Sequence, residues 1–316
     1  MTTPSDRQQG CMLGALLADA ASLGLHWIYD PQRIAEVAAK HLGPAFVPIN
    51  AQHYADVPAY FAHAKRHNGD LSQYGLTLYL AIQNMLLHEG KLNVPDYQEA
   101  FAETFAAGGS YVGYIDAPTR GTLANLSSGI KTPSGIEDDQ HPAIARLPAV
   151  LALMGSRPCS TDDIRAAVEI SNLGESTLAY SLVFSRLLQR VLGGLQIDEA
   201  LQQTLDEIPD GDMRQKLAEA LNTSESDSVI YGGTTERACH LSQGLPLSFH
   251  ILSHAKSYRE AVQTNILAGG DSCGRALMIG AVYGAQAGTA GLPVEWLLQL
   301  NNGYQLWQDC HTLANR

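Results

Sequence analysis

The residues with the most chemical potential lie in a turn before a predicted helix. Gly269 and Gly270 permit a backbone turn with positive φ, and Asp271 or Ser272 then stands where it can cap the helix. Cys273 falls in the first helical turn, where the helix dipole lowers the pKa of a thiol. The segment therefore predicts a nucleophilic thiol, or free N–H groups that hold an anion. A helix cap beside a packed, inert cysteine explains the same residues, and both interpretations stay open.

A second turn that opens a predicted helix carries side chains with oxygen atoms. Asp70, Ser72 and Gln73 follow Gly69 at short intervals. Carboxylate, hydroxyl and amide oxygens are the ligands that Mg²⁺ prefers in proteins. Helix capping accounts for the same side chains equally well.

Other segments offer weaker candidates. His26, at the end of a predicted helix, is a candidate general base or a hydrogen-bonded core histidine. Asp138 and Asp139 lie in an acidic loop that either binds a cation or is simply solvated near a helix N-terminus. Tyr111 and Tyr114 fit a pocket wall on which a ring stacks, or a compact turn filled by two tyrosines.

The elements that must position these residues are helices. Apolar residues recur mostly at helical spacing, and no convincing alternation typical of a strand is present. The predicted helices span residues 10–25, 73–88, 97–107, 143–154, 162–171, 178–192, 197–205, 213–221, 235–241, 245–254, 258–267 and 274–288. No linker and no solenoid repeat interrupts them. We therefore expect a single all-α domain over residues 1–316.

Composition narrows the class of protein. The chain has 316 residues, of which 45% are hydrophobic and 16% charged, as in a packed globular body and unlike a disordered chain. The formal net charge of −12 argues against a nucleic-acid partner. It leaves open a local pocket for one phosphorylated small molecule, because net charge governs long-range attraction. The sequence lacks the dinucleotide, P-loop, zinc-protease and hydrolase-elbow motifs.

The cysteines and the N-terminus indicate the compartment. The five cysteines form no C-x-x-C pair and predict free thiols in a reducing environment; they are Cys11, Cys159, Cys239, Cys273 and Cys310. The first ten residues are polar, and no apolar run reaches about 18 residues. We expect a soluble cytoplasmic protein without a membrane partner. The oligomeric state is left open.

The order of the segments resembles a known family. Residues 10–20 are similar to the opening helix of the ADP-ribosylglycohydrolase family, usually read as G-x-x-x-G-A-x-x-G-D-A. Residues 238–271 resemble that family's run into its G-G-D-T-D-T motif. Within the family, the amino acids at residues 18–21, 26–30, 69–75 and 270–275 most resemble those of its crystallin J1-like branch. The similarity covers nearly the whole chain.

This resemblance implies an all-α fold with a binuclear Mg²⁺ site that hydrolyses the glycosidic bond between ADP-ribose and a protein side chain or related acceptor. At the positions matching the early metal motif, Gln73 and Tyr74 replace both aspartates. In the late motif Asp271 is retained, while Cys273 stands at the second aspartate and Gly274 at the threonine. Because two Mg²⁺ ions need several carboxylates, we expect a degenerate metal site and no resident cofactor, although the resemblance itself implies Mg²⁺.

Three functional hypotheses follow. The first is a hydrolase acting on an ADP-ribosyl or related ribosyl N-glycoside with the metal site degenerate. The second is an enzyme of altered chemistry with Cys273 as nucleophile, His26 as base and Arg275 as anchor for an anionic substrate. The third is a non-catalytic, crystallin J1-like protein that binds a ligand or has a structural role. The candidate catalytic residues are His26, Asp70, Asp271 and Cys273. The candidate substrate-binding residues are Ser72, Gln73, Tyr74, Tyr111, Tyr114, Asp138, Asp139, Ser272 and Arg275.

Overall fold

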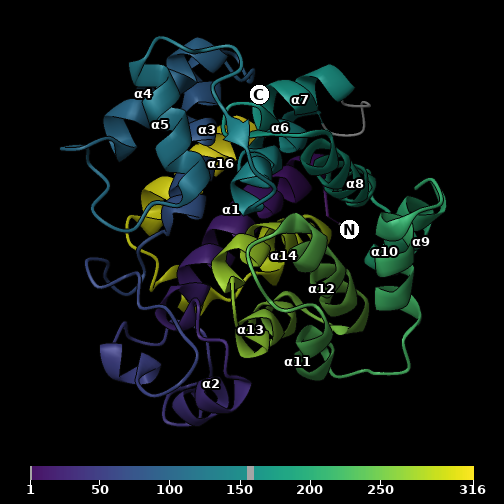
Figure 1. Cartoon of the computed structure of the whole chain (residues 1–316). Coiled ribbons are helices and arrows are strands. Elements are labelled where there is room, and N and C mark those ends of the chain that lie inside the picture. The colour runs from purple at the N-terminus through teal and green to yellow at the C-terminus, as the bar shows by residue number, and fades with distance from the viewer. Residues whose placement is uncertain (1, 155–159) are drawn as a thin grey trace.

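Two long helices far apart in the sequence form the centre of the molecule. The computed structural model describes residues 2–154 and 160–316, so Cys159 lies outside the described residues. Helix α1 (Pro4–Ser22) and helix α14 (Ser272–Ala287) lie together in the middle of Figure 1, and both are buried over most of their length. They can approach closely because glycines meet across the contact. A Cβ atom on Gly280 would stand 2.4 Å from the carbonyl oxygen of Gly14, so a side chain there would collide.

A shell of helices packs around this pair (Figure 1). Their apolar faces are buried against the centre, which is what their helical apolar spacing predicts. They are α3 (Gln73–Leu87), α6 (Leu147–Met154), α8 (Glu175–Leu192), α12 (Leu241–His254), α13 (Tyr258–Ala268) and α16 (Gly303–Ala314).

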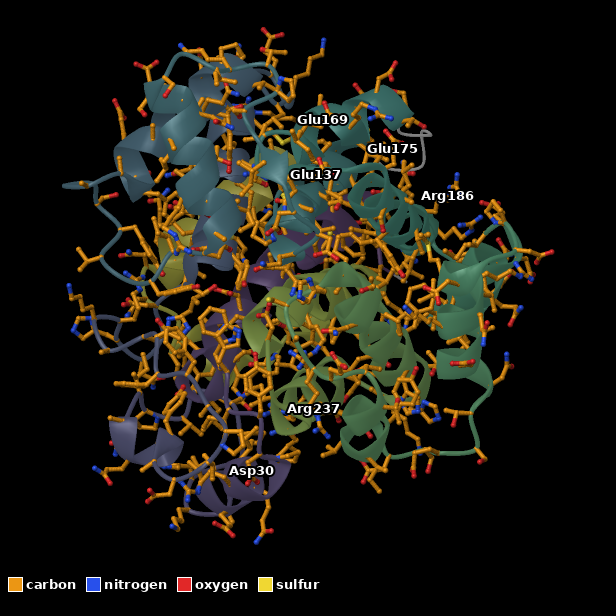
Figure 2. The ribbon with its side chains drawn as sticks, viewed as in Figure 1. Asp30, Glu137, Glu169, Glu175, Arg186 and Arg237 are labelled. Carbon is orange, nitrogen blue, oxygen red and sulfur yellow. The ribbon has the colours of Figure 1, made fainter. Side chains whose placement is uncertain are left out.

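The outer elements are shorter. The helices among them are α2 (Pro31–Ala38), α4 (Val94–Phe105), α5 (Ala117–Ser127), α7 (Thr161–Val168), α9 (Ile197–Asp206), α10 (Asp212–Asn222), α11 (Ser228–Tyr231) and α15 (Val294–Leu297). The 3₁₀ turns are η1 (Leu23–Leu25), η2 (Ala51–Tyr54), η3 (His141–Ile144), η4 (Gly232–Thr234) and η5 (Thr289–Gly291). Figure 2 shows Arg237, which follows η4, near α11 and α13.

Strand structure is minimal among the described residues. Strand β1 (Ile136–Glu137) pairs in parallel with β2 (Asn172–Leu173), with Ile136 opposite Asn172. In Figure 2, Glu137 lies at this pair together with Glu169 and Glu175. The acidic loop leaves β1 and is held by an isolated bridge between Gln140 and His240. The all-α fold class predicted from the sequence is confirmed.

The structure corrects several predicted elements. The predicted helix at 235–241 is wrong: residues 235–240 are not helical, because Glu236 and Arg237 have positive φ values of 64° and 60°. Helix α12 instead begins at Leu241 and continues through Pro246. Helices α2, α5, α11, α15 and α16 are absent from the predicted set. No helix among the described residues has the length and apolar character needed to cross a membrane.

Candidate functional site

Asp271 forms the centre of the site at the start of α14. Gly269 and Gly270 have positive φ values of 76° and 67°, which turn the chain into the helix as predicted. Oδ1 of Asp271 accepts a hydrogen bond from the N–H of Gly274 at 2.9 Å. Asp271 is therefore the helix cap, and its carboxylate has no exposed surface.

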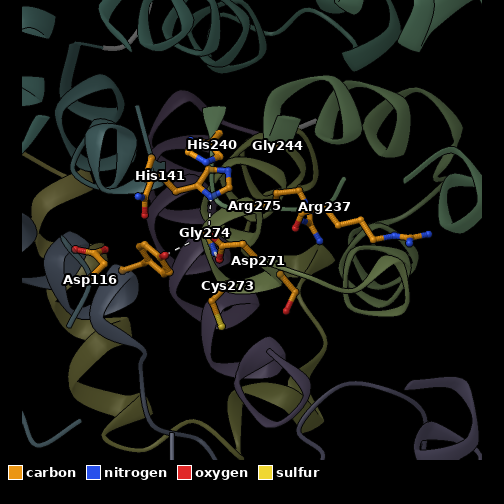
Figure 3. A network of polar contacts seen from close by, with 12 residues as sticks. Asp116, His141, Arg237, His240, Gly244, Asp271, Cys273, Gly274 and Arg275 are labelled. Carbon is orange, nitrogen blue, oxygen red and sulfur yellow. Dashed lines mark hydrogen bonds and ion pairs between the residues drawn. The ribbon is translucent and has the colours of Figure 1, made fainter. Parts of the chain in front are cut away.

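Three side chains from other elements surround this carboxylate, and Figure 3 shows one of them, His141, next to Asp271. The imidazole Nδ1 of His141 donates to Oδ2 at 2.6 Å, and the hydroxyl of Tyr74 donates to the same oxygen at 3.2 Å. Nε2 of His26 lies 3.6 Å from Oδ1. Burial alone would raise the pKa of Asp271, but His141 and then His26 hold it well below its usual value. Asp271 is therefore an anion held by hydrogen bonds from protein groups.

His26 is held as a neutral ring. Its Nδ1 accepts a hydrogen bond from the backbone N–H of Cys273 at 3.0 Å, which places the ring hydrogen on Nε2. Burial lowers the pKa of His26 to about 4, against the opposing charge of Asp271. His26 reaches the site as predicted, but its basic nitrogen is already occupied by the backbone.

The prediction that Cys273 has an activated thiol is wrong. The residue stands in the first turn of α14 as expected, yet its side chain is fully buried with Sγ 3.7 Å from the carbonyl oxygen of Asp19. Burial raises the pKa of the Cys273 thiol well above its usual value, and the charges of Asp19 and Asp271 raise it further. The helix dipole and Arg275 do not outweigh these effects, so the nucleophile hypothesis loses its physical basis.

Arg275 has a structural role in place of the predicted anchoring role. Its guanidinium is fully buried, and its Nε donates to Oδ1 of Asn265 at 2.9 Å while Nη2 donates to the carbonyl oxygen of Gly269 at 2.5 Å. Burial lowers the pKa of Arg275 to about 10, so the group stays charged at neutral pH. It fixes the turn before α14. Ser272 beside it is buried, and its hydroxyl has no partner.

The early motif meets the late motif at this point. Tyr74 and Asp271 are in contact although 197 positions separate them. Ser72 caps α3, and its hydroxyl and N–H donate to the two carboxylate oxygens of Asp19 at 2.5 and 2.7 Å. Burial raises the pKa of Asp19 to about 7, against the bonds from Ser72. Gly75 leaves room for this carboxylate, since a Cβ there would stand 2.2 Å from Oδ2 of Asp19.

Gln73 binds a carboxylate that is absent from the set predicted from the sequence. Its side-chain amide donates to Asp116, and its oxygen accepts the Asp116 N–H at 2.8 Å. Asp116 caps α5, and burial raises its pKa to about 6, helped by the charges of Asp138 and Asp271. An aspartate just before Ala117-Pro118 is a helix-start signal that could have found it.

His141 is also absent from the predicted set, although it adjoins the acidic loop. That loop is pinned to the start of α12, where the His141 N–H donates to the carbonyl of Cys239 at 3.1 Å. Asp139 contacts His240 at 2.6 Å, so it is tied to the same segment. Asp138 accepts from the amide of Asn172 at 3.1 Å. Only the three-dimensional pairing of these two segments brings His141 to Asp271.

The half-buried groups around the buried cluster are Asp138 and Cys239. Burial raises the pKa of Asp138. Burial raises the pKa of Cys239 to about 12, and the negative charges of Asp271, Asp138 and Asp116 act in the same direction. The charges of these carboxylates act on the Cys239 thiol, and Asp138 and Cys239 are both partly exposed, in contrast to Asp271.

The tyrosines and Asp70 are placed differently. The hydroxyl of Tyr111 donates to the carbonyl of Tyr114 at 3.1 Å, so these two rings form a compact turn. Tyr114 is half-buried and meets Trp27 edge-on at 5.0 Å. Asp70 binds the N–H of His67 and the amide of Asn301, both at 2.8 Å. These contacts hold Asp70 in its own loop, and no hydrogen bond joins it to the Asp271 cluster.

The residues present do not fit a pair of Mg²⁺ ions. The carboxylates of Asp19, Asp116 and Asp271 already accept hydrogen bonds from N–H and O–H groups of the protein. Mg²⁺ requires oxygen ligands with free lone pairs in an octahedron. No group of three or more His, Cys, Asp or Glu side chains among the described residues could hold a metal ion.

Comparison with known proteins places this site in context. The family model described as ADP-ribosylglycohydrolase matches residues 1–316. The chain belongs to the ADP-ribosylglycohydrolase family. The early and late motifs therefore meet at Tyr74 and Asp271, two positions at which the resemblance implies metal ligands.

Similar proteins agree with this assignment. Crystallin J1A of Tripedalia cystophora is 24% identical, over 98% of this chain and 96% of its own length. Crystallin J1B of the same organism is 23% identical, over 95% and 94%. A solved structure titled "ADP-ribosylglycohydrolase-related protein complex" has a TM-score of 0.69 and 15% identity, covering 100% of this chain and 99% of that chain. The expected likeness to crystallin J1 proteins is confirmed, and the structural neighbour shows the fold.

Proposed function

We propose that the protein hydrolyses an ADP-ribosyl or related ribosyl N-glycoside without the binuclear Mg²⁺ centre that its family resemblance implies. Family membership supports the class of ligand, a small molecule or side chain that carries ADP-ribose. The metal-free part rests on one observation, the bond from His141 to Asp271 at 2.6 Å. Asp271 is the carboxylate retained at the matched metal positions, and a protein donor already occupies it.

The chemistry is assigned to carboxylates at the more exposed side of the cluster. N-glycoside hydrolysis needs a proton on the leaving nitrogen and a water at the anomeric carbon, and negative charge favours the oxocarbenium-like transition state. Asp138 is half-buried and its pKa is raised, which suits a proton donor. The buried charge of Asp271 and the carboxyl of Asp116 supply the negative field. Tyr114 offers a ring face near this region.

The second candidate is a non-catalytic, crystallin-like protein that binds a ligand or has a structural role. One observation favours it: Asp271, His141 and His26 have no exposed surface, so no substrate atom can touch them in this conformation. The likeness to crystallins J1A and J1B fits the same role. The first candidate predicts turnover of an ADP-ribosyl N-glycoside, and the second predicts none.

A hydrolysis assay tests the proposal and separates the candidates. ADP-ribosyl-arginine is incubated with the protein in EDTA and, separately, in Mg²⁺, and released ADP-ribose is measured. We expect equal turnover in both, and a fall of about 10²-fold or more in kcat for Asp138→Asn, because the proton donor is lost. Asp162→Asn, an exposed aspartate on α7, is the matched control and should leave turnover unchanged.

The contradicting results are specific. Turnover that requires Mg²⁺ would refute the metal-free part of the proposal. If ADP-ribosyl-arginine binds but no ADP-ribosyl N-glycoside is turned over in either buffer, the hydrolase is wrong and the second candidate is favoured.

A further inference from the structure

The ring of His141 occupies an enclosed position between two helices. The side chain has no exposed surface, and its Nδ1 contacts Oδ2 of Asp271 at 2.6 Å (Figure 3). Its backbone N–H is fixed to Cys239. The backbone at His141 is therefore fixed to the segment before α12, and the fully buried ring is confined between α12 and α14.

Two glycines make the space that the ring fills. A Cβ atom on Gly244 of α12 would stand 2.1 Å from Nε2 of His141, and one on Gly274 of α14 would stand 2.3 Å from Nδ1. Both distances are far below van der Waals contact, so neither position accepts a side chain while the ring is present. Gly274 stands where the family motif has threonine, so the residue that opens the space also departs from the metal motif.

The ring also donates a hydrogen bond to the buried carboxylate of Asp271. A buried carboxylate is costly unless it is paired and hydrogen-bonded. The donors to Asp271 are His141, the hydroxyl of Tyr74 and the N–H of Gly274. Nε2 of His141 has no hydrogen-bond partner, so the ring is held by this one polar contact and by its fit between the helices.

We propose that the imidazole of His141 is an internal replacement for a metal ion, seated in a space that Gly244 and Gly274 shape and binding the carboxylate that a cation would otherwise neutralise. This inference rests on the metal-free part of the proposed function. It predicts that the space left in a variant without the His141 ring binds free imidazole. It also explains why retention of Asp271 does not imply retention of the metal.

Imidazole rescue tests the inference through stability. His141→Ala removes the ring and leaves Asp271 buried without its closest donor, so we expect a lower Tm than wild type. Free imidazole should raise the Tm of His141→Ala saturably by several degrees, because a ligand that binds only the folded state stabilises it. Wild type and His41→Ala, an exposed histidine, should not respond. Folding of His141→Ala only in the presence of imidazole would support the inference equally.

A double-mutant cycle gives an independent reading. The three atoms nearest to a Cβ at Gly244 all belong to His141, so Gly244→Ala should lower the Tm strongly when the ring is present. Adding His141→Ala should raise the Tm of Gly244→Ala, which is the reverse of its effect in wild type.

Two results would overturn the inference. One is a Tm of His141→Ala that does not change with imidazole, and the other is a double variant less stable than Gly244→Ala alone. These failures are distinguishable from failure of the proposed function, because turnover in EDTA by the wild-type protein does not depend on either measurement. The first of these results includes the case in which MgCl₂ stabilises His141→Ala and imidazole does not.

Discussion

At the scale of residues, burial decides which side chains can react. Cys273 and Cys239 both lie near Asp271, but only Cys239 is partly exposed among the cysteines that the structure describes. Sequence spacing located Cys273 correctly in the first turn of α14, and it could not show that α1 covers that turn. The position that the helix dipole requires is therefore present, but burial raises the pKa of the Cys273 thiol and opposes its ionisation.

This leads to a prediction for thiol labelling. Among the cysteines in the described part of the chain, we expect iodoacetamide at pH 7.5 to modify Cys239 first, although slowly, because its pKa is raised to about 12. Cys11, Cys273 and Cys310 are buried and should react only as the protein unfolds. Peptide mapping by mass spectrometry measures the rates, with the unfolded protein in guanidinium as control. Labelling of Cys273 as fast as Cys239 would restore the nucleophile hypothesis.

At the scale of elements, the contact between α1 and α14 carries the site. Sequence could predict both helices, because each is rich in small apolar residues, but not that their glycines face each other. That contact sets Asp19 of α1 beside Ser72 and the first turn of α14. The positions of Asp19 and His141 follow from tertiary packing, which is why no local pattern ranked them as site residues.

The same contact gives a prediction on stability. Gly280→Ala places a methyl group 2.4 Å from the carbonyl of Gly14, so we expect the free energy of unfolding to fall by about 1–3 kcal/mol. Helix propensity alone would predict a gain of about 1 kcal/mol. Gly233→Ala is the control, since the nearest atom to its Cβ is a flexible arginine nitrogen at 3.6 Å. Urea denaturation followed by circular dichroism decides the sign, and an unchanged or higher stability for Gly280→Ala would refute the close packing.

A buried histidine in α12 gives a prediction on pH. His250 accepts from the hydroxyl of Ser228 at Nδ1 and donates from Nε2 to the carbonyl of Glu225, both at 2.8 Å. Burial lowers its pKa below 6.5. The unfolded chain therefore takes up the proton first, and this contribution to stability is complete above about pH 6.5 and is lost as the pH falls toward the lowered pKa.

The variant His250→Gln keeps a donor for Glu225 and removes the titration. We expect its stability to fall less between pH 7 and pH 5 than that of wild type, by at most about 1.4 kcal/mol per pH unit. His41→Gln, exposed, should keep the wild-type slope. Equal slopes for His250→Gln and wild type would show that His250 does not titrate differently on folding.

At the scale of the whole molecule, the sequence predicted the fold class and the family but only part of the site. Helical apolar spacing was sufficient to predict the fold class, and the early and late motifs were sufficient to predict the family. Both are local patterns in the sequence. The family resemblance implies that Tyr74 and Asp271, from the early and late motifs, lie together. It does not imply that Asp70 is held in its own loop. The break at residues 235–240 could not be predicted, because Glu236 and Arg237 adopt positive φ only where the loop meets the turn at Asp271.

The central claim is that protein groups have replaced the metal pair around Asp271. Isothermal titration of MgCl₂ into the wild-type protein, with the protein first treated with EDTA and dialysed, tests it most directly. The account predicts no saturable binding up to millimolar Mg²⁺, because His141, Tyr74 and Gly274 occupy the carboxylate. Saturable binding of two Mg²⁺ ions per chain with a submillimolar Kd would contradict it.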